Sequence, residues 1–475
     1  MTSIDSGPVP RRTVLRGVGA LTVAAALTPA ATAGADTPDW EVLRNRLRGK
    51  LLLPADGEYH SAKQLFDPQF DSEAPVAVVT AAAASDVTAA VVFARDHRLP
   101  LAARAGGHSY VGASATTGAL VVDVRGLDDI ALNGDLVTVG AGVTIRPLLA
   151  ELDQSGRSLP IGSCPTVGLA GLTLGGGLGV DSRRYGLTCD ALESADVVLP
   201  GGAIAHTSAN QLPGLFWALR GAGGSAGILT SLTFRTSPAE ARDVARLGFP
   251  ADAATRVLTA WARWLPGADR SVWSNVEIGA AAGTVECSVV IVTPAGQGAT
   301  AIAGLSAAAA TAPVSVTHRT LGHLAAADDL AGGSATPRST KVAGSDVVTE
   351  LNAAVAGTIV DIVTSRARSG APGYVLVDPL DGAVRDVRAD ASAFPWREHA
   401  ATLQWIVDAP DAPEDARAWI TGAHRTLGAA SAGAYANYCE PGVAAERCYA
   451  GNLARLRALA RSTDPNGLLR TGITL

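Results

Sequence analysis

"GSCPTVGLAGLTLGGGLG", residues 162–179, is the stretch of this 475-residue chain that says most about its fold. It holds seven glycines, namely Gly162, Gly168, Gly171, Gly175, Gly176, Gly177 and Gly179. Glycine loses more backbone entropy on folding than any other residue, so this density is costly inside a helix or a strand. We therefore expect an extended loop wrapped around a ligand that carries phosphates. A glycine-rich structural hairpin is the alternative.

A second glycine-rich loop, "RAGGHSYVGA" at residues 104–113, directly follows an apolar run and contains a histidine. Glycines permit positive φ angles and let backbone N–H groups approach an anion closely. The spacing is not that of the GxGxxG fingerprint, which opens a helix in dinucleotide-binding folds. Taken alone, this loop also fits a tight turn with a surface histidine, so its interpretation depends on the first stretch.

Around these loops, short apolar runs alternate with segments of helical period. We predict strands within residues 76–80, 99–106, 119–124, 136–143, 195–207 and 227–237, and helices within 85–100, 144–156 and 212–224. Ser85 is the expected N-cap of the first helix, because serine side chains satisfy free N–H groups at helix starts.

The character of the sequence changes after Ser237. Alanine-rich helical stretches, such as 299–312, alternate with strand-like runs at 288–293, 373–378 and 402–408. This pattern predicts a second α+β unit, a sheet backed by helices. Near the end of the chain, a helix is expected over 450–462, before the turn sequence Asp-Pro-Asn-Gly.

Composition narrows the class of protein. Hydrophobic residues make up 48% of the chain and charged residues 17%, which allows a large buried core. The formal net charge is −6 and no block of like charges occurs, so we expect no nucleic-acid partner.

The first 35 residues have the features of an export leader. Arg11-Arg12 precedes a short apolar run and the small-residue site Ala31-Thr32-Ala33. The pair resembles a twin-arginine signal, which directs the export of folded proteins; an ordinary secretory leader is the alternative. We expect a secreted or extracytoplasmic protein with no stable membrane anchor once the leader is removed.

The chain has five cysteines, an odd number, and no CxxC pattern of the kind that binds zinc. Cys439 and Cys448 are close enough in sequence to pair as a disulfide. Free buried thiols are the alternative for these two, and the expectation for Cys189 and Cys287.

Taken together, the two loops resemble those of the FAD-linked oxidases of the vanillyl-alcohol oxidase superfamily. The resemblance is to the berberine bridge enzyme-like group, which includes glucooligosaccharide oxidase and aclacinomycin oxidoreductase. Three later stretches match the group in order: "LFWALRGAGGSAGILTSLTF" from residue 215, "DGAVRDVRADASAFPWREHAATLQW" from 381, and "YAGNLARLRALARSTDPNGLLR" from 449.

The resemblance implies an α+β fold with a two-part PCMH-type FAD-binding domain and a substrate domain whose antiparallel sheet is backed by helices. The expected boundaries are 1–35 for the signal peptide, 36–237 for the FAD-binding domain with its core at about 72–237, 238–430 for the substrate-binding domain, and 431–475 for a C-terminal segment that returns to the FAD-binding domain.

In that group a histidine and a cysteine both bond covalently to the flavin, and the matching residues here are His108 and Cys164. Imidazole and thiolate are nucleophiles suited to such a bond. The further residues expected to bind FAD are Arg104, Ala105, Gly106, Gly107, Ser109, Val167, Gly168, Gly171, Leu172, Gly175, Gly176, Gly177, Gly179, Ile228 and Asn452. No metal is expected.

The relatives use a tyrosine in a Y-x-N-Y segment as the catalytic base, and "YANYCEP" places Tyr438, with Tyr435 second, in that role. Packing beneath the cofactor is the alternative for both. Trp396, Arg397 and Trp405, together with Phe394, are candidates for facing the substrate, whereas Trp261, Trp264 and Trp273 are expected in the core. Because aromatic residues total only 5% of the chain, core packing is the alternative for most of the first group as well.

The resemblance therefore predicts an oxidase that removes a hydride from an alcohol or hemiacetal of a sugar, glycoside or small secondary metabolite. Val167 favours molecular oxygen as the electron acceptor, because a valine at this position accompanies oxidase activity in the group. A dehydrogenase with another acceptor and a flavoprotein that sequesters a metabolite are the alternatives. We expect a monomer or a weak dimer.

Overall fold

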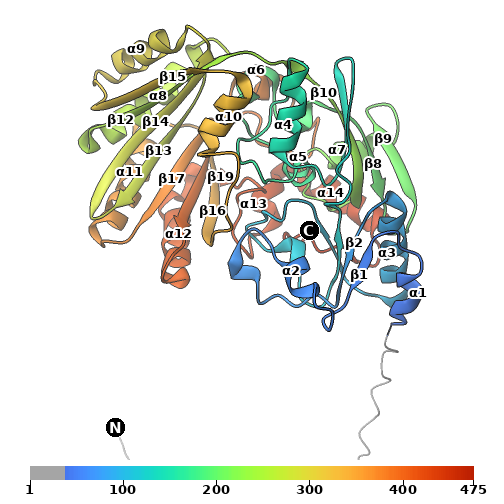
Figure 1. Cartoon of the computed structure of the whole chain (residues 1–475). Coiled ribbons are helices and arrows are strands. Elements are labelled where there is room, and N and C mark those ends of the chain that lie inside the picture. Colours follow the sequence, from blue (N-terminus) through green and yellow to red (C-terminus); the bar gives the residue numbers. More distant parts are fainter. Residues whose placement is uncertain (1–37) are drawn as a thin grey trace, which may run out of the picture. The chain divides into compact units, whose positions relative to one another are not determined.

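The computed structural model describes residues 38–475, so the expected leader and its arginine pair lie outside the described residues. Residues Trp40–Leu475 form one compact unit (Figure 1). Its first sheet has the order β1 (Lys50–Leu52), β2 (Ala77–Thr80), β4 (Leu120–Asp123), β3 (Leu101–Arg104). β3 and β2 both run parallel to β4. Helix α3 (Ala84–His97) connects β2 to β3, as parallel strands require a crossover.

A second, antiparallel sheet has the order β5 (Ile130–Asn133), β6 (Leu136–Gly140), β10 (Ile228–Arg235), β8 (Leu192–Val198), β9 (Ile204–Ser208). One hydrophobic cluster joins the two sheets with α3, α4 (Ile145–Gln154) and α7 (Pro213–Ala218). The expected strands and helices of this half are present, including the hairpin of β8 and β9 around Pro200.

The start of α3 differs from the expectation, because its N-cap is Ala83 rather than Ser85. No side chain caps the helix, but the buried carboxylate of Asp86 in its first turn binds the backbone that precedes it. It accepts the backbone N–H of Ala82 at 2.9 Å and those of Arg48 and Gly49 at 2.9 and 3.0 Å. One aspartate thus holds the helix start and the preceding chain together.

The glycine-rich stretch is not wholly extended, because Leu169–Gly175 forms the short helix α5. Most of its glycines lie at the ends: Gly168 is the N-cap, and Gly176 and Gly177 follow the helix with φ of 122° and 87°. Burial of Leu169 and Ala170 offsets the cost of the interior Gly171, which is about 1 kcal/mol relative to alanine.

The third large sheet is antiparallel, with the order β15 (Ser315–Leu321), β12 (Arg242–Phe249), β14 (Thr284–Pro294), β13 (Trp273–Ala281), β17 (Gly373–Pro379), β18 (Ala401–Asp408), β16 (Lys341–Val348), β19 (Ser431–Gly433). Helices α8 (Ala254–Trp264), α9 (Gly298–Ala309), α11 (Ala353–Arg368) and α12 (Pro413–Leu427) pack on one face and share a separate hydrophobic cluster with it (Figure 1). The opposite face borders a cavity, with β13 and β17 contributing side chains to its lining.

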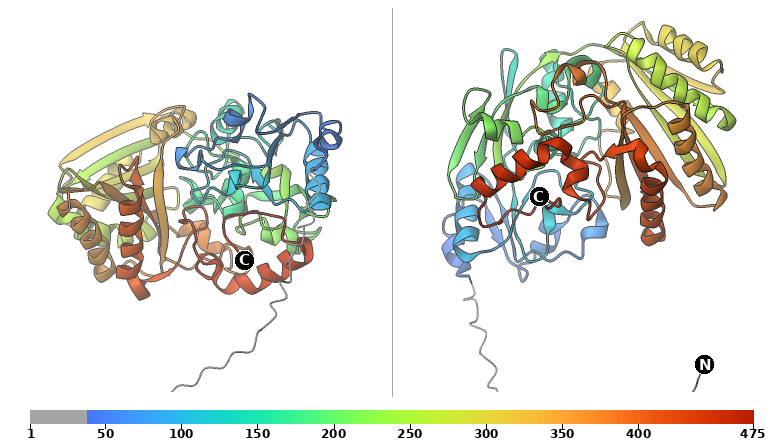
Figure 2. Two further views of the ribbon diagram at one scale, coloured as in Figure 1. Left: turned by 90° about the horizontal axis from the view of Figure 1, so that it is seen from below. Right: turned by 180° about the vertical axis from the view of Figure 1, so that it is seen from behind.

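The C-terminal segment returns to the first half of the chain. Helix α14 (Leu453–Thr463) follows α13 (Ala445–Tyr449) and packs against α7 (Figure 2). The last residues then lie beside β3: Leu101 N donates to Leu468 O at 2.8 Å, and Arg470 N donates to Leu101 O at 2.7 Å.

The smaller elements are α1 (Trp40–Arg44), α2 (Tyr59–Lys63), α6 (Ser182–Tyr185), α10 (His323–Ala331) and the two-stranded sheet of β7 (Arg157–Ser158) and β11 (Ser237–Pro238). Within residues 38–475, no helix is both long and apolar enough to cross a membrane. The predicted α+β fold class, with a helix-backed antiparallel sheet, is confirmed.

Candidate active site

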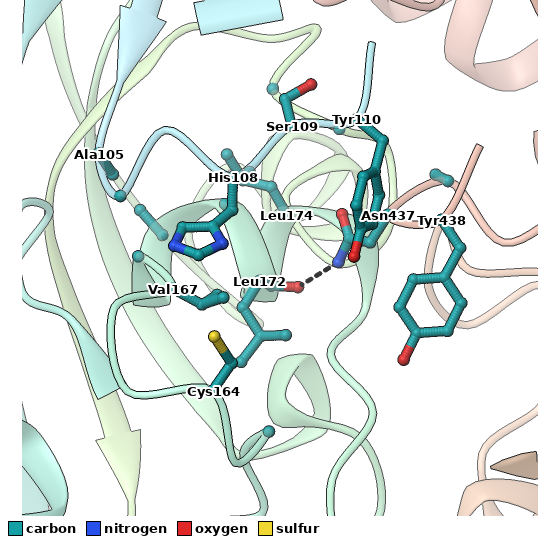
Figure 3. A pocket seen from close by; sticks show the side chains of 18 of the residues that line it. Ala105, His108, Ser109, Tyr110, Cys164, Val167, Leu172, Leu174, Asn437 and Tyr438 are labelled. Atoms are coloured by element: carbon teal, nitrogen blue, oxygen red, sulfur yellow. Dashed lines mark hydrogen bonds between the residues drawn. The ribbon is translucent and has the colours of Figure 1, made fainter. Parts of the chain in front are cut away.

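A cavity of about 490 Å³ lies between the first half of the chain and the open face of the eight-stranded sheet. The loop after β3, the segment around α5 and the start of β10 form one wall. Side chains from β13 and β17 and the turn at 436–439 form the other. Figure 3 shows His108, Cys164 and Val167 on one side of this cavity and Asn437 and Tyr438 on the other.

The loop after β3 is held by its backbone and by a buried arginine. Gly107 has a φ of 71°, and its carbonyl accepts the N–H of Phe66 at 3.1 Å. Arg104 is a predicted FAD-binding residue, but its side chain lies beneath the loop, paired with Asp123 and donating to Gln64 O at 3.1 Å. Ala105, Gly106, Gly107, His108 and Ser109, which are expected to bind FAD, line the cavity.

The two glycine-rich segments touch each other. A Cβ on Gly106 would lie 2.3 Å from Gly168 N, and a Cβ on Gly168 would lie 2.4 Å from Gly106 N. His108 Nε2 and Thr166 Oγ1 are hydrogen-bonded at 2.9 Å, and Thr166 lies two residues after Cys164. The fold therefore brings His108 and Cys164 to one cavity from distant positions in the sequence.

His108 is held as a neutral side chain. Burial and the positive charge of Lys341 together lower the pKa of His108 to about 4. Its ring stacks on Phe66, with centroids 3.9 Å apart and 17° between the planes. Cys164 is half-buried and its Sγ lies 3.7 Å from Thr336 Oγ1. At neutral pH the imidazole thus has an unprotonated nitrogen available for bonding.

The predicted glycines of the long stretch divide into two groups. Gly168, Gly171 and Gly179 line the cavity, as do Val167, Leu172 and Ile228. Gly175, Gly176 and Gly177 lie outside the cavity lining. A Cβ on these three would meet Asn437 Oδ1 at 2.0 Å, Phe394 Cδ2 at 2.8 Å and Thr188 Oγ1 at 2.3 Å. Glycine is needed there for packing of protein against protein.

The sheet wall follows from the alternation of side chains along a strand. On β13, Trp273 and Asn275 line the cavity, whereas Val276 and Ile278 pack among the helices. On β17, Leu376 and Asp378 line the cavity, and Val375 and Val377 pack on the helix side. Trp273, expected in the core, thus belongs to the cavity.

Asp378 is the buried carboxyl group of this wall, with 8% of its surface exposed. Asn275 Nδ2 donates to its Oδ1 at 3.5 Å, and Tyr438 lies near enough to interact electrostatically with it. Burial raises the pKa of Asp378 to about 6, although the interactions with Asn275 and Tyr438 oppose the shift. The carboxyl group therefore titrates just below neutral pH.

The two predicted catalytic tyrosines lie in different surroundings. Tyr438 lines the cavity beside Asp378, and burial raises its pKa well above the ordinary value. Tyr435 is 1% exposed and lies outside the lining; its hydroxyl accepts the N–H of Gly177 at 3.0 Å and an N–H of Asn437 at 2.9 Å. Tyr435 therefore supports the turn that carries Tyr438.

The predicted substrate residues do not reach the cavity. Trp396 Nε1 donates to Ala434 O at 2.9 Å, and Arg397 pairs with both carboxylate oxygens of Asp190 at 2.6 and 2.7 Å. Trp405 is fully buried on the helix side of β18 and donates to Asp346 Oδ2 at 2.9 Å. All three are absent from the lining because their polar groups serve the fold.

Two further expectations change in the same way. Phe394 is 2% exposed and packs over Gly176, outside the lining. Asn452, a predicted FAD-binding residue, donates instead to the carbonyls of Ala389 and Ser392 at 2.8 and 3.1 Å. Its amide fixes the loop that leads to Phe394.

Sequence reasoning missed Asp378, Asn275 and Gln404. Gln404 Nε2 donates to the hydroxyl of Tyr110 at 3.2 Å, and Tyr110 lines the cavity. The available signal was the parity of the strand, because Gln404 and Trp405 must point to opposite faces. Asp378 ends an apolar run, "GYVLVD", in which a carboxylate is the exception.

The chain is similar to known FAD-linked proteins. Residues 75–208 match the family model of an FAD binding domain. An uncharacterized FAD-linked oxidoreductase of Bacillus subtilis (strain 168), YgaK, is 28% identical over 90% of this chain and 96% of its own length. Glucooligosaccharide oxidase of Sarocladium strictum is 33% identical over 42% of each chain.

Solved structures extend the likeness along the chain. The xylooligosaccharide oxidase of Myceliophthora thermophila C1, solved with xylobiose, has a TM-score of 0.83 and 25% identity over 92% of this chain and 99% of its own. The resemblance to the FAD-linked oxidases is thereby confirmed. Residues 75–208 match an FAD binding domain, and the protein is an FAD-dependent oxidoreductase that is similar to the oligosaccharide oxidases.

Proposed function

We propose that the protein is an oxidase that oxidises an alcohol or hemiacetal of a sugar, glycoside or small secondary metabolite and reduces molecular oxygen to hydrogen peroxide. The observation that carries this proposal is the pair Tyr438 and Asp378, which borders the same cavity as His108 and Cys164. The similarity to gluco- and xylooligosaccharide oxidases supports a substrate with a CH–OH group.

The wall opposite Tyr438 fits FAD. A Cβ on Gly171 would meet no atom within 4 Å, so this part of the lining leaves room for a flat ligand. We propose that His108 and Cys164 both bond to the flavin, and that the backbone of residues 105–109 holds its phosphates. When Nε2 of His108 donates to Thr166, the lone pair of Nδ1 is available as the nucleophile. Bound FAD supplies the hydride acceptor.

Tyr438 is the base in this proposal. Its raised pKa keeps the phenol protonated at neutral pH, so it can accept a substrate proton only if its own proton moves on. The carboxylate of Asp378, which lies beside Tyr438 in the cavity wall, is the proposed acceptor for that proton. The pair thus moves a proton from the substrate hydroxyl to Asp378 while the adjacent carbon loses its hydride.

Oxygen is the proposed electron acceptor because Val167 lines the cavity. Export through a twin-arginine route, with the flavin bound before export, and a monomeric or weakly dimeric state are part of the same proposal. A dehydrogenase with another acceptor and a flavoprotein without turnover are the rival functions.

The test is reduction by a panel of sugars, glycosides and secondary alcohols without oxygen, followed by mixing with air. We expect the yellow colour to bleach with a substrate and to return within seconds, with one peroxide formed per substrate oxidised. Reoxidation over minutes would indicate a dehydrogenase. Failure of every member of a broad panel to bleach the flavin would favour sequestration.

A further inference from the structure

Two thiols lie in contact beside the catalytic tyrosine. Cys439 directly follows Tyr438, and its Sγ lies 3.3 Å from Sγ of Cys448 on α13. Each cysteine is 1% exposed. Cys439 Sγ also lies 3.2 Å from Tyr435 O, so the thiol packs inside the turn that carries Tyr438.

Cys439 also borders the cavity, although its residue is almost wholly buried. The remaining cysteines differ from this pair. Cys164 lies on the opposite wall as a proposed attachment point for FAD. Cys189 and Cys287 are buried away from the lining, in two other hydrophobic clusters. Cys439 is thus a thiol with both a thiol neighbour and access to the reaction chamber.

We propose that Cys439 and Cys448 form a modification site, a dithiol that hydrogen peroxide made in the cavity converts to a disulfide. The site itself follows from the geometry of the two thiols. The formation of peroxide inside the cavity, next to Cys439, rests on the proposed oxidase function.

The reaction has two steps. The thiol of Cys439 loses its proton, its sulfur attacks one oxygen of the peroxide and the O–O bond breaks; the departing hydroxide takes up a proton to give water, and Cys439 becomes a sulfenic acid. The sulfur of Cys448 then attacks the sulfenic sulfur and releases a second water. Two thiols lose two electrons, and one peroxide is reduced to two waters. The sulfur atoms move from 3.3 Å to a bond length of about 2.05 Å, a small displacement.

The rate of the first step is low. The hydrogen bond with Cys448 and burial raise the pKa of Cys439 well above its ordinary value, so little thiolate is present at neutral pH. The disulfide should therefore accumulate over many turnovers and form faster at higher pH. Once formed, it ties the Tyr438 turn to α13 across nine residues of chain.

This inference also accounts for the odd number of cysteines. One cysteine is assigned to the flavin, two to the oxidised pair, and the two buried in hydrophobic clusters stay as thiols. Full-length protein denatured without reductant after turnover should therefore contain two free thiols per chain.

The experiment uses the flavin-loaded protein, reduced with a phosphine and desalted without oxygen. One sample receives an alcohol substrate from the panel in air, and a second receives hydrogen peroxide alone. Both are denatured in iodoacetamide, and the peptides are analysed by mass spectrometry. In both samples we expect a peptide pair linked through Cys439 and Cys448, while Cys189 and Cys287 carry the label as internal controls.

The arms separate the two proposals. If added peroxide links the pair but substrate produces neither peroxide nor the link, the oxidase function fails and the site stands. If neither sample contains the link although peroxide is present, the site is overturned. Added catalase should prevent the link in the sample that receives hydrogen peroxide. In the sample that receives substrate, most of the link should still form. Full protection of both would overturn delivery within the cavity.

The variant Cys448→Ser sharpens the result. Without its partner thiol, Cys439 should stop at the sulfenic acid and become labelled by dimedone. Labelling of Cys439 by dimedone to the same extent in the unsubstituted protein would contradict the assignment of Cys448 as the resolving thiol.

Discussion

The two walls of the cavity are built from different parts of the chain and by different means. The FAD-side wall is formed largely by glycine-rich backbone, with Gly106 and Gly168 in direct contact and the side chains of His108 and Cys164 projecting from it. The sheet-side wall consists of side chains on alternate positions of strands, among them Asn275 and Asp378. A backbone wall can hold a cofactor that does not vary, whereas a side-chain wall can be changed for each substrate. We therefore expect damage to the first to remove the cofactor and damage to the second to alter the chemistry.

The largest effect is expected for Tyr438→Phe. Loss of a positioned base typically slows a proton transfer by about 10²- to 10⁴-fold, and we expect that loss in the rate of flavin reduction, with FAD content unchanged. Stopped-flow absorbance without oxygen measures it. Tyr374→Phe is the matched control, because Tyr374 likewise lies beside an aspartate, donating to Asp408 at 3.0 Å, but is outside the cavity lining. Equal rates in both variants would remove Tyr438 from the role of base.

The next effect tests the backbone wall. In Gly168→Ala the new Cβ meets backbone atoms of the neighbouring loop, which has no flexible end to move aside. Overpacking of this kind costs about 1–3 kcal/mol, which corresponds to roughly fivefold to 150-fold weaker binding of FAD before it is covalently attached. The flavin-to-protein absorbance ratio of the purified protein measures it. Gly201→Ala, where a Cβ meets no atom within 4 Å, should keep the full ratio.

The third prediction concerns pH. Because the pKa of Asp378 is raised to about 6, its carboxyl group is ionised above that pH and protonated below it. A protonated Asp378 cannot accept the proton of Tyr438, so flavin reduction should fall about tenfold per pH unit below about 6. In Asp378→Asn this limb of the pH profile should vanish. An unchanged limb in the variant would assign it to another group.

The smallest effects compare the two faces of β18. Trp405→Phe leaves the buried carboxylate of Asp346 without one donor, at a cost of about 1–3 kcal/mol in the free energy of unfolding. Gln404→Leu removes the hydrogen bond to Tyr110 and should raise the substrate KM about three- to tenfold. Denaturant titration and steady-state kinetics separate the two. A changed KM with an unchanged free energy of unfolding in Trp405→Phe would indicate that Trp405 contacts the substrate.

The FAD-side wall could be predicted from the sequence because its residues lie in two contiguous glycine-rich motifs. His108, Cys164 and most of the cavity-lining glycines are identifiable from spacing and resemblance. Gly175, Gly176 and Gly177 belong to the same motif, yet they make room for Asn437, Phe394 and Thr188. Sequence indicates that a side chain is excluded at such positions, but not whether a ligand or another part of the protein excludes it.

The side-chain wall was harder to predict because its residues are far apart in sequence and only strand parity decides their direction. Sequence resemblance predicts Trp405 as a substrate residue. The alternation of side chains along β18 instead places Trp405 on the helix side and its neighbour Gln404 on the cavity side. Asp378 belongs to the site because β17 lies beside β13, and a single sequence does not specify that pairing. The helix-backed sheet itself followed from the periodicity of its segments.

The most direct test of the central claim is peptide mapping of the protein digested without reductant and followed by flavin absorbance. The account predicts a single yellow species in which the peptides containing His108 and Cys164 are joined through one FAD. Flavin that separates from both peptides on acid denaturation would contradict the claim that these two residues meet on one cofactor.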